Sequence, residues 1–284
     1  TRVRPVLAYC RRNPQLVVGL CMVVGLILFG LVGRLFVNVA SAQPTSAIPS
    51  QAPGPGHWLG TDTQGRDMLA VMVAGVPLTV WVGMVAGAVG VGIGVVLGLI
   101  AGFRGGLIDA IVRLFVDSLL TVPGLLVLVV ITASIKGVIS INVMALVIAS
   151  LAWMHPTRTI RSQVLTLRER QYLQVARFSG MRSMEVLLRE VFPNIIPYIA
   201  ASFVGAVAAA VLATVGLEAL GLGPQNSTDL GMTIYWAIYY NALLRGMWWW
   251  WLAPIVAIVI LFFGLYLTAA GLDEFANPRR RKAA

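Results

Sequence analysis

The chain has 284 residues, of which 58% are hydrophobic and 11% are charged, and its mean hydropathy is +0.86. Soluble domains are about one quarter charged, so much of this chain must face lipid, and we predict an integral membrane protein. The formal net charge of +10 does not indicate nucleic-acid binding, because the basic residues are spread over loops and form no patch with interleaved aromatic side chains.

The first 37 residues predict a cytoplasmic basic segment followed by a membrane span. Residues 1–14 carry four arginines, which suit an anionic membrane surface, and residues 15–37 have the apolar length that crosses a bilayer. This apolar run is too long for a signal peptide, and no small-x-small site follows Phe36, so we expect it to be retained. Cys10 and Cys21 predict no disulfide framework or metal site, and we expect both to be buried small apolar residues.

Residues 38–76 predict a loop outside the membrane, because Ser41–Gly56 is rich in Pro, Ser and Gly. Asp62 and Asp67 alternate with loop residues that could supply carbonyl oxygens to calcium. Their spacing lacks the EF-hand pattern, however, and Asp67 is placed to cap a short helix over Met68–Val76. We therefore predict a structural role for these aspartates and no metal site.

Residues 77–103 predict the second span, which carries a stripe of glycines at every fourth position. These are Gly90, Gly94, Gly98 and Gly102. In lipid such a stripe lets another helix approach closely, so we assign it to helix packing. A nucleotide-binding loop would need a lysine after its last glycine, and neither Lys136 nor Lys282 follows a glycine. We do not expect this chain to hold the ATPase site of a transporter.

Residues 109–134 predict the third span, with a break at Pro123 and the glycine after it. Arg113 and Asp117 lie four residues apart near its start and can pair on one helix face. A proton relay is the alternative function for these two side chains. We favour the structural ion pair.

Residues 141–158 predict the fourth span, which continues past His155 and Pro156. An intramembrane enzyme would need a nucleophile and a base, and His155 is the only histidine near a membrane segment. Because His155 has no evident ligand partner in the sequence, we interpret it as an interfacial side chain.

The polar loop 159–197 separates two apolar segments, and its pattern predicts two short helices. The first covers Tyr172–Ser179 and ends at Gly180, which can adopt the left-handed conformation that closes a helix. The second begins at Ser183 and ends at Pro193, which is disfavoured inside a helix. We therefore predict that residues 172–193 form a structured polar segment between two membrane spans, which we call the knuckle.

The remaining segments are a fifth span, a loop, a sixth span and a basic tail: 198–217, 218–250, 251–272 and 273–284. The loop carries its own amphipathic segment, Met232–Tyr240. Four consecutive tryptophans, Trp248–Trp251, could stack on bases but are typical of an aromatic belt at the membrane interface. We predict the belt.

The charge distribution predicts which loops face the cytoplasm. With the N-terminus inside, all but four of the 21 lysines and arginines fall on the inner side. The four exceptions are Arg34, Arg66, Lys136 and Arg245. By the positive-inside rule, both termini and the 159–197 loop lie in the cytoplasm.

The knuckle resembles the EAA loop of ABC-importer permease subunits, which is a coupling helix seated in a groove of the cytoplasmic ATPase. The match consists of Gln174-Val175-Ala176, then Gly180 four residues later and a helix ending at Pro193. Gln174 and Val175 stand where the family has Glu and Ala. The resemblance implies that the ATPase-coupling residues are Tyr172, Gln174, Val175, Ala176, Arg177, Gly180 and Pro193.

Further matches occur in the right order along the chain. They are HWLGTDTQGRD at 57–67, VDSLLTVPG at 116–124, LRERQYL at 167–173 and LGLG at 220–223. The first resembles the C-type subunits of dipeptide, oligopeptide and nickel importers. The resemblance implies an all-α, six-span type I permease fold in a bacterial inner membrane. It also implies a B-type permease partner, two ATPase domains that hold ATP and Mg, and an extracytoplasmic substrate-binding protein, with no cofactor on this chain itself.

An ion-coupled secondary transporter is the main alternative function. That class uses buried carboxylates near the middle of the membrane and inverted repeats. Only Asp117 and Glu218 are candidates here, and both are predicted near the ends of spans. The sequence therefore favours the importer permease, and it leaves open whether the substrate is a dipeptide, an oligopeptide, a nickel chelate or haem.

Overall fold

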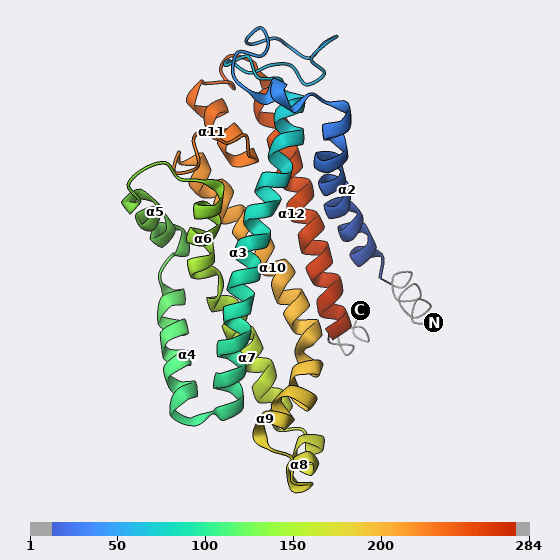
Figure 1. Ribbon diagram of the computed structural model, residues 1–284, viewed down its shortest axis with the longest axis vertical. Helices are drawn as coiled ribbons and strands as arrows, with labels where there is room; N and C mark the ends of the chain where they lie inside the picture. Colours follow the sequence, from blue (N-terminus) through green and yellow to red (C-terminus); the bar gives the residue numbers. More distant parts are fainter. Residues whose placement is uncertain (1–12, 277–284) are drawn as a thin grey trace.

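The computed structural model describes residues 13–276, which form a long helical bundle (Figure 1). In chain order its helices are α2 (Pro14–Phe36), η1 (Val39–Ala42), α3 (Met68–Arg104), α4 (Gly106–Thr121), α5 (Gly124–Ser134), α6 (Ile141–Ala152), α7 (Met154–Arg168), α8 (Gln171–Phe178), α9 (Ser183–Val186), η2 (Leu187–Val191), α10 (Phe192–Ala219), α11 (Leu230–Tyr239) and α12 (Trp248–Ala276). Cys10 and most of both basic end segments lie outside the described residues. Cys21 is exposed on α2, so the prediction that it is buried was wrong.

The described helices confirm an all-α membrane fold with several spans. Five continuous helices are long and apolar enough to cross a bilayer: Pro14–Phe36, Met68–Arg104, Ile141–Arg168, Ser183–Ala219 and Trp248–Glu274. The pair α4 and α5 makes a sixth if its two halves are one span, and they meet at an angle of 83°. The break lies at Val122 and Pro123, as predicted, because proline cannot donate the backbone hydrogen bond that would continue α4.

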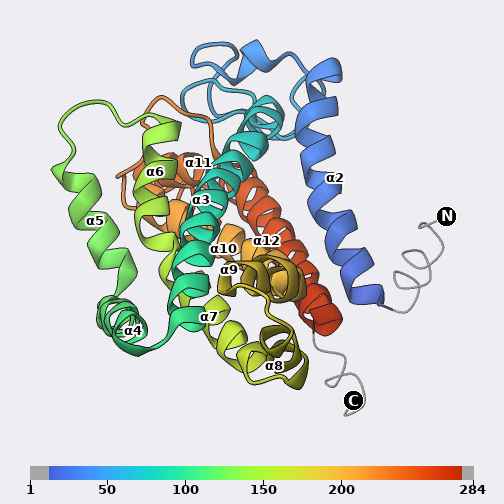
Figure 2. The ribbon, with the colours of Figure 1, turned by 60° about the horizontal axis from the view of Figure 1, so that its bottom comes forward.

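Helix α3 is the central element of the bundle (Figures 1 and 2). It packs against α7, α10, α6 and α2, while α12 packs against both α2 and α10. It begins where the Asp67 carboxylate accepts hydrogen bonds from the N–H groups of Leu69 and Ala70, and this confirms the predicted cap. It then runs through Pro77 without a break, so the prediction of a separate short helix before Pro77 was wrong. The Pro77 ring packs against Gly30 of α2, and this packing accommodates it inside the helix.

The helices on both sides of the polar loop are longer than predicted. The fourth span continues to Arg168, and the fifth is continuous with the second helix of the knuckle from Ser183 onward. Pro193 therefore does not end a helix. Just before it, η2 is a π-helical turn in which the Phe192 N–H donates to the carbonyl of Leu187, five residues earlier. This wider turn removes the clash that Pro193 would make with an α-helical carbonyl, so the chain continues into α10.

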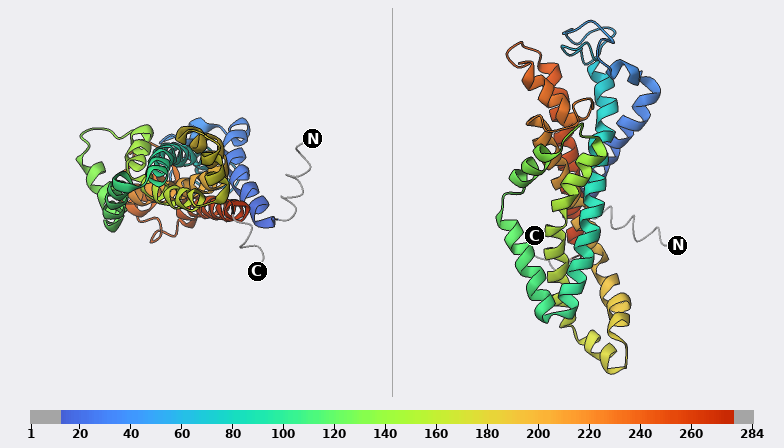
Figure 3. Two further views of the ribbon diagram at one scale, coloured as in Figure 1. Left: turned by 90° about the horizontal axis from the view of Figure 1, so that it is seen from below. Right: turned by 60° about the vertical axis from the view of Figure 1, so that its left-hand side comes forward.

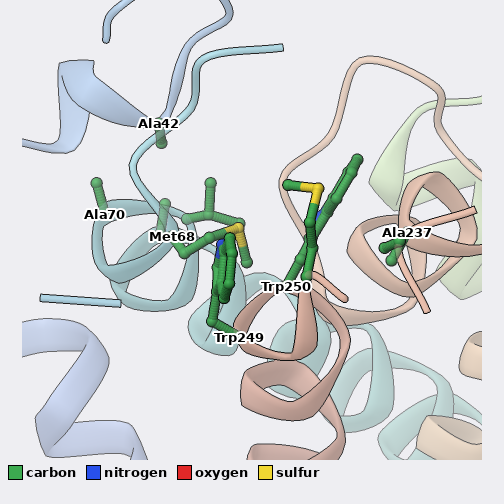
Figure 4. Packing of buried hydrophobic residues seen from close by; sticks show 10 residues of the cluster. Ala42, Met68, Ala70, Ala237, Trp249 and Trp250 are labelled. Atoms are coloured by element: carbon green, nitrogen blue, oxygen red, sulfur yellow. The ribbon is translucent and has the colours of Figure 1, made fainter. Parts of the chain in front are cut away.

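The cap, which we define as residues 38–67 and 220–247, covers the end of the bundle opposite α8 (Figure 3, right). Two of the four consecutive tryptophans pack inside it (Figure 4). Trp249 is 8% exposed and Trp250 1%, and the Trp249 indole N–H donates to the carbonyl of Thr61 at 3.1 Å. The prediction of an interfacial belt fails for these two residues, because cap segments far away in the sequence cover them. Trp248 remains 53% exposed.

Candidate functional site

Helix α8 is the extreme tip of the bundle at the end opposite the cap (Figure 1). It ends at Gly180, whose φ of +84° is the left-handed conformation predicted for this position. The Met181 N–H closes the turn by donating to the carbonyl of Ala176 at 3.2 Å. A Cβ at Gly180 would meet no neighbouring atom, so the demand for glycine comes from the backbone angle alone.

The two faces of α8 differ in solvent exposure. Leu173 is fully buried, and Ala176 packs partly buried against the same apolar cluster, which includes Ile160 and Ile195. The exposed face carries a set of side chains with i, i+3 and i+4 spacing: Tyr172 (40% exposed), Gln174, Val175 (62%) and Phe178 (89%). The side chain of Arg177 is outside the described set. An amphipathic helix with exposed apolar side chains on its outer face is typical of a docking surface for another protein.

Sequence reasoning missed Phe178, and it counted Ala176 among the ATPase-coupling residues although this residue lies on the inner face of α8. Phe178 is the most exposed side chain of the apolar set, and its spacing of three residues from Val175 was the available signal. Ala176 points toward the bundle, where its small size allows α8 to lie close to the inner cluster.

The knuckle is tied to α10 by side chains as well as by the chain itself. The Asn194 amide donates to the Tyr172 hydroxyl at 3.5 Å and to the carbonyl of Glu190 at 2.6 Å. Burial and the nearby Glu190 carboxylate raise the pKa of Tyr172, which therefore stays a neutral phenol at physiological pH. Leu173 contacts the start of the same long helix through the inner cluster. These contacts join α8 to the start of α10.

Helix α10 also forms one wall of a cavity with a volume of about 600 Å³. The other walls come from α4, α5, α6 and α7. Apart from Leu212, the α10 wall consists of small residues: Ser202, Gly205, Ala206, Ala209, Ala210 and Ala213. The lining includes the polar side chains of His155, Thr159 and Ser202, and among the described residues that line it there is no Asp, Glu, Lys or Arg. The cavity is thus a mostly apolar space with uncharged walls.

The glycine stripe of α3 lies directly against the helix that faces the cavity. A Cβ on any of the four glycines would be within 3.0 Å of the segment from Ala152 to Val164. At Gly90 it would lie 2.6 Å from the Cβ of Ala152. At Gly102 it would lie 2.8 Å from the Cβ of Val164. The glycines therefore allow the backbones of α3 and α7 to come into contact and so fix the position of α7.

An ion pair links α4 to α7, but it is a different pair from the predicted one. The Asp109 carboxylate accepts two hydrogen bonds from the Arg161 guanidinium, one of them from Nη2 at 2.6 Å. No ion pair joins Arg113 to Asp117 in the described part of the chain; instead both line a small cavity of about 150 Å³ beside Arg161. Pairing between helices gives Asp109 a bidentate arginine, which is stronger than a pair along one helix face.

Comparison with known proteins places these features in a family. Residues 94–282 match the model of the binding-protein-dependent transport system inner membrane component. The chain is similar to the oligopeptide transport system permease protein OppC of Mycobacterium bovis, with 32% identity over 81% of this chain and 79% of the relative. It is also similar to two Bacillus subtilis proteins. Its identity to OppC is 28% over 96% of this chain and 88% of the relative, and its identity to the dipeptide transport system permease protein DppC is 25% over 98% and 88%.

The matched region contains α8, the α10 wall of the cavity and the contacts of Gly94, Gly98 and Gly102 with α7. This chain belongs to the inner membrane components of binding-protein-dependent transport systems, as a C-type permease subunit of an ABC importer.

Proposed function

We propose that this permease subunit forms half of the membrane path for di- or oligopeptides. The relatives carry peptide-transport names, and the cavity wall suits such substrates. Peptides share a backbone but differ in side-chain charge, so a path lined by uncharged residues avoids selecting among them by charge. A homologous B-type permease supplies the other half of the path, and an extracytoplasmic binding protein delivers the substrate.

The subunit crosses a bacterial inner membrane with the cap outside. The inner loops hold most of the lysines and arginines, which supports a cytoplasmic location for α8 and for both termini. In this orientation α8 reaches the compartment that contains ATP, while the cap faces the binding protein.

Two ATPase subunits or domains hold ATP and Mg and carry out the hydrolysis. The outward face of α8 docks in a groove of one of them, and closure of the ATPases displaces α8 together with α10. Because α10 forms a wall of the cavity, this displacement changes which side of the membrane the cavity opens to. This chain binds an ATPase, transmits its movement to α10 and encloses part of the path, whereas the ATPases cleave ATP.

The observation that supports this mechanism most directly is the uncovered apolar face of α8, with Phe178 89% and Val175 62% exposed. We expect the double variant Val175→Ala, Phe178→Ala to bind the ATPase about tenfold more weakly or worse, since buried apolar anchors each contribute about 1–2 kcal/mol at interfaces. ATP hydrolysis stimulated by the binding protein, and peptide uptake, should fall in the same proteoliposomes.

The control is Val138→Ala, which removes an even more exposed valine (84%) from the loop before α6 at the cap end. This variant should bind and couple normally. If the double variant assembles with the ATPase and hydrolyses ATP as the control does, α8 is not the coupling element.

A further inference from the structure

The cap end of α10 carries a carboxyl group that is fully enclosed in protein. Glu218 is 0% exposed, and neither of its two carboxyl oxygens has a hydrogen-bond partner among the described residues. Asp229, just before α11, is also 0% exposed, and its Oδ2 lacks a partner too. A buried polar atom without a partner costs about 1–3 kcal/mol, and an unpaired charge costs more. Three such oxygens in one place indicate a missing hydrogen-bond donor.

In the described part of the chain, no lysine or arginine pairs with Glu218. From α3, Gly75 lies against the chain before Asp229, and the hydroxyl of Thr79 accepts the Leu230 N–H at 3.1 Å. From α12, the apolar side chains Ala257 and Ile258 pack on Leu230. These elements present no positive charge to this corner.

Asp229 is the ionisable neighbour of Glu218, and Gly231, two residues after Asp229, packs against a Glu218 carboxyl oxygen. Two carboxylates side by side in a buried site do not both ionise, because their repulsion adds to the cost of removing each from water.

The space around the pair is closed. A Cβ at Gly223 would lie 2.5 Å from the Glu218 Cγ, and Gly231 packs directly against a Glu218 carboxyl oxygen. A hydrated metal ion needs room and further oxygen ligands, and the described residues contain no group of three or more side chains suited to a metal. A proton needs no volume, so it fits where an ion does not.

The two helix ends decide which carboxyl holds the proton. Glu218 lies in the last turn of α10, where the partial negative charge of the helix end opposes a carboxylate. Asp229 is the N-cap of α11, and its Oδ1 accepts the Met232 N–H at 2.8 Å. The partial positive charge of this helix start favours the ionised form. Glu218 is thus the acid, and Asp229 is the base.

We propose that Glu218 and Asp229 form a proton-binding site, in which the Glu218 carboxylic acid donates to Oδ2 of Asp229. The proton comes from water, and its addition turns two buried acceptors into a donor and an acceptor. The resulting bond joins the end of α10 to the start of α11 across the Leu220–Gly223 turn. In alkaline solution the proton leaves, and the two adjacent buried charges push α11 away from α10.

Infrared spectroscopy of the full chain in lipid nanodiscs tests the site directly. At pH 7 the wild-type protein should show the carbonyl stretch of one protonated carboxylic acid, and this band should shift in D₂O. Glu218→Gln keeps a donor to Asp229 but has no acidic proton, so the band should be lost. Asp62→Asn is the control, because Asp62 is also buried but is paired with Arg66 at 3.3 Å. Its substitution should leave the band in place.

A pH series on the wild-type protein gives a second measurement. The wild-type melting temperature should fall, and the carboxylic-acid band should fade, over the same alkaline range. The melting temperature of Glu218→Gln should not fall over that range. Absence of the band in the wild-type protein at pH 7 would overturn the proposal. So would persistence of the same band in Glu218→Gln, or a melting temperature that depends on sodium or calcium instead of pH.

Discussion

Glycines of α3 differ sharply in what a side chain would meet. Gly94 lies against α7, and a Cβ there would be 2.6 Å from the Cβ of Pro156 and 2.9 Å from the backbone nitrogen of Thr157. Gly92, two residues earlier in the same helix, has no atom within 4 Å of that position. The same residue type therefore serves close packing at one site and is open to substitution at the other.

This contrast predicts opposite effects for the same small substitution. Gly94→Ala should lower the free energy of unfolding by about 1–3 kcal/mol, because the new methyl group must push apart two backbones in contact. Gly92→Ala should leave stability unchanged or raise it by up to about 1 kcal/mol, because alanine is the better helix former. Thermal unfolding of both variants in the same detergent checks this. Equal destabilisation would show that the α3–α7 contact is looser than the structure has it.

At the scale of elements, the junction between the knuckle and α10 depends on one unusual turn. The π-helical segment η2 carries one more residue per turn than an α-helix would, and Pro193 follows it at once. A proline at this point prevents the α-helical hydrogen bond that would otherwise close over the same residues. The rotational setting of α8 and α9 relative to α10 is therefore fixed by Pro193.

Pro193→Ala should release this setting. With an N–H at position 193 the turn can relax to an α-helix, which rotates the knuckle by about 100° relative to α10. We expect the variant to insert and assemble normally while ATP hydrolysis stimulated by the binding protein falls. Pro197→Ala is the control, because Pro197 lies inside α10 beyond the π turn. Full coupling in Pro193→Ala, or an equal loss in both variants, would contradict the role given to this turn.

At the scale of the whole molecule, the two ends of the bundle differ in charge and in shape. The cap end holds the Pro- and Ser-rich loop, and the other end holds α8 and α9 with the arginine-rich loop around them (Figure 3). This asymmetry is the basis for orienting the subunit in the membrane.

Cysteine labelling in a variant without Cys10 and Cys21 tests the orientation. A cysteine at Ser46, in the cap loop, should react with an impermeant maleimide added to intact cells. A cysteine at Ser179, which is exposed at the end of α8, should react only after the membrane is permeabilised. The reverse pattern would place α8 outside, away from ATP, and would exclude its coupling function.

Much of the fold could be predicted because it depends on local patterns. Apolar length gave the spans, Pro123 gave the break in the third, and Asp67 and Gly180 gave a helix start and a helix end. Each of these depends on a few neighbouring residues. The predictions that failed at Pro77 and Pro193 treated proline as a helix end, whereas packing on Gly30 in one case and a π turn in the other accommodate it.

The sequence by itself determined the membrane class, the family and the location of the polar loop that contains α8, because composition, charge bias and short motifs are properties of adjacent residues. The tertiary structure alone decided which face of α8 is uncovered and that Ala176 points inward. It alone also decided that Trp249 is buried and hydrogen-bonded to Thr61, which is 188 residues away in the sequence. It also brought Glu218 against Asp229 with no cation between them. These facts depend on how helices distant in sequence pack together, and no local pattern encodes the distance between residues that meet only in the folded chain.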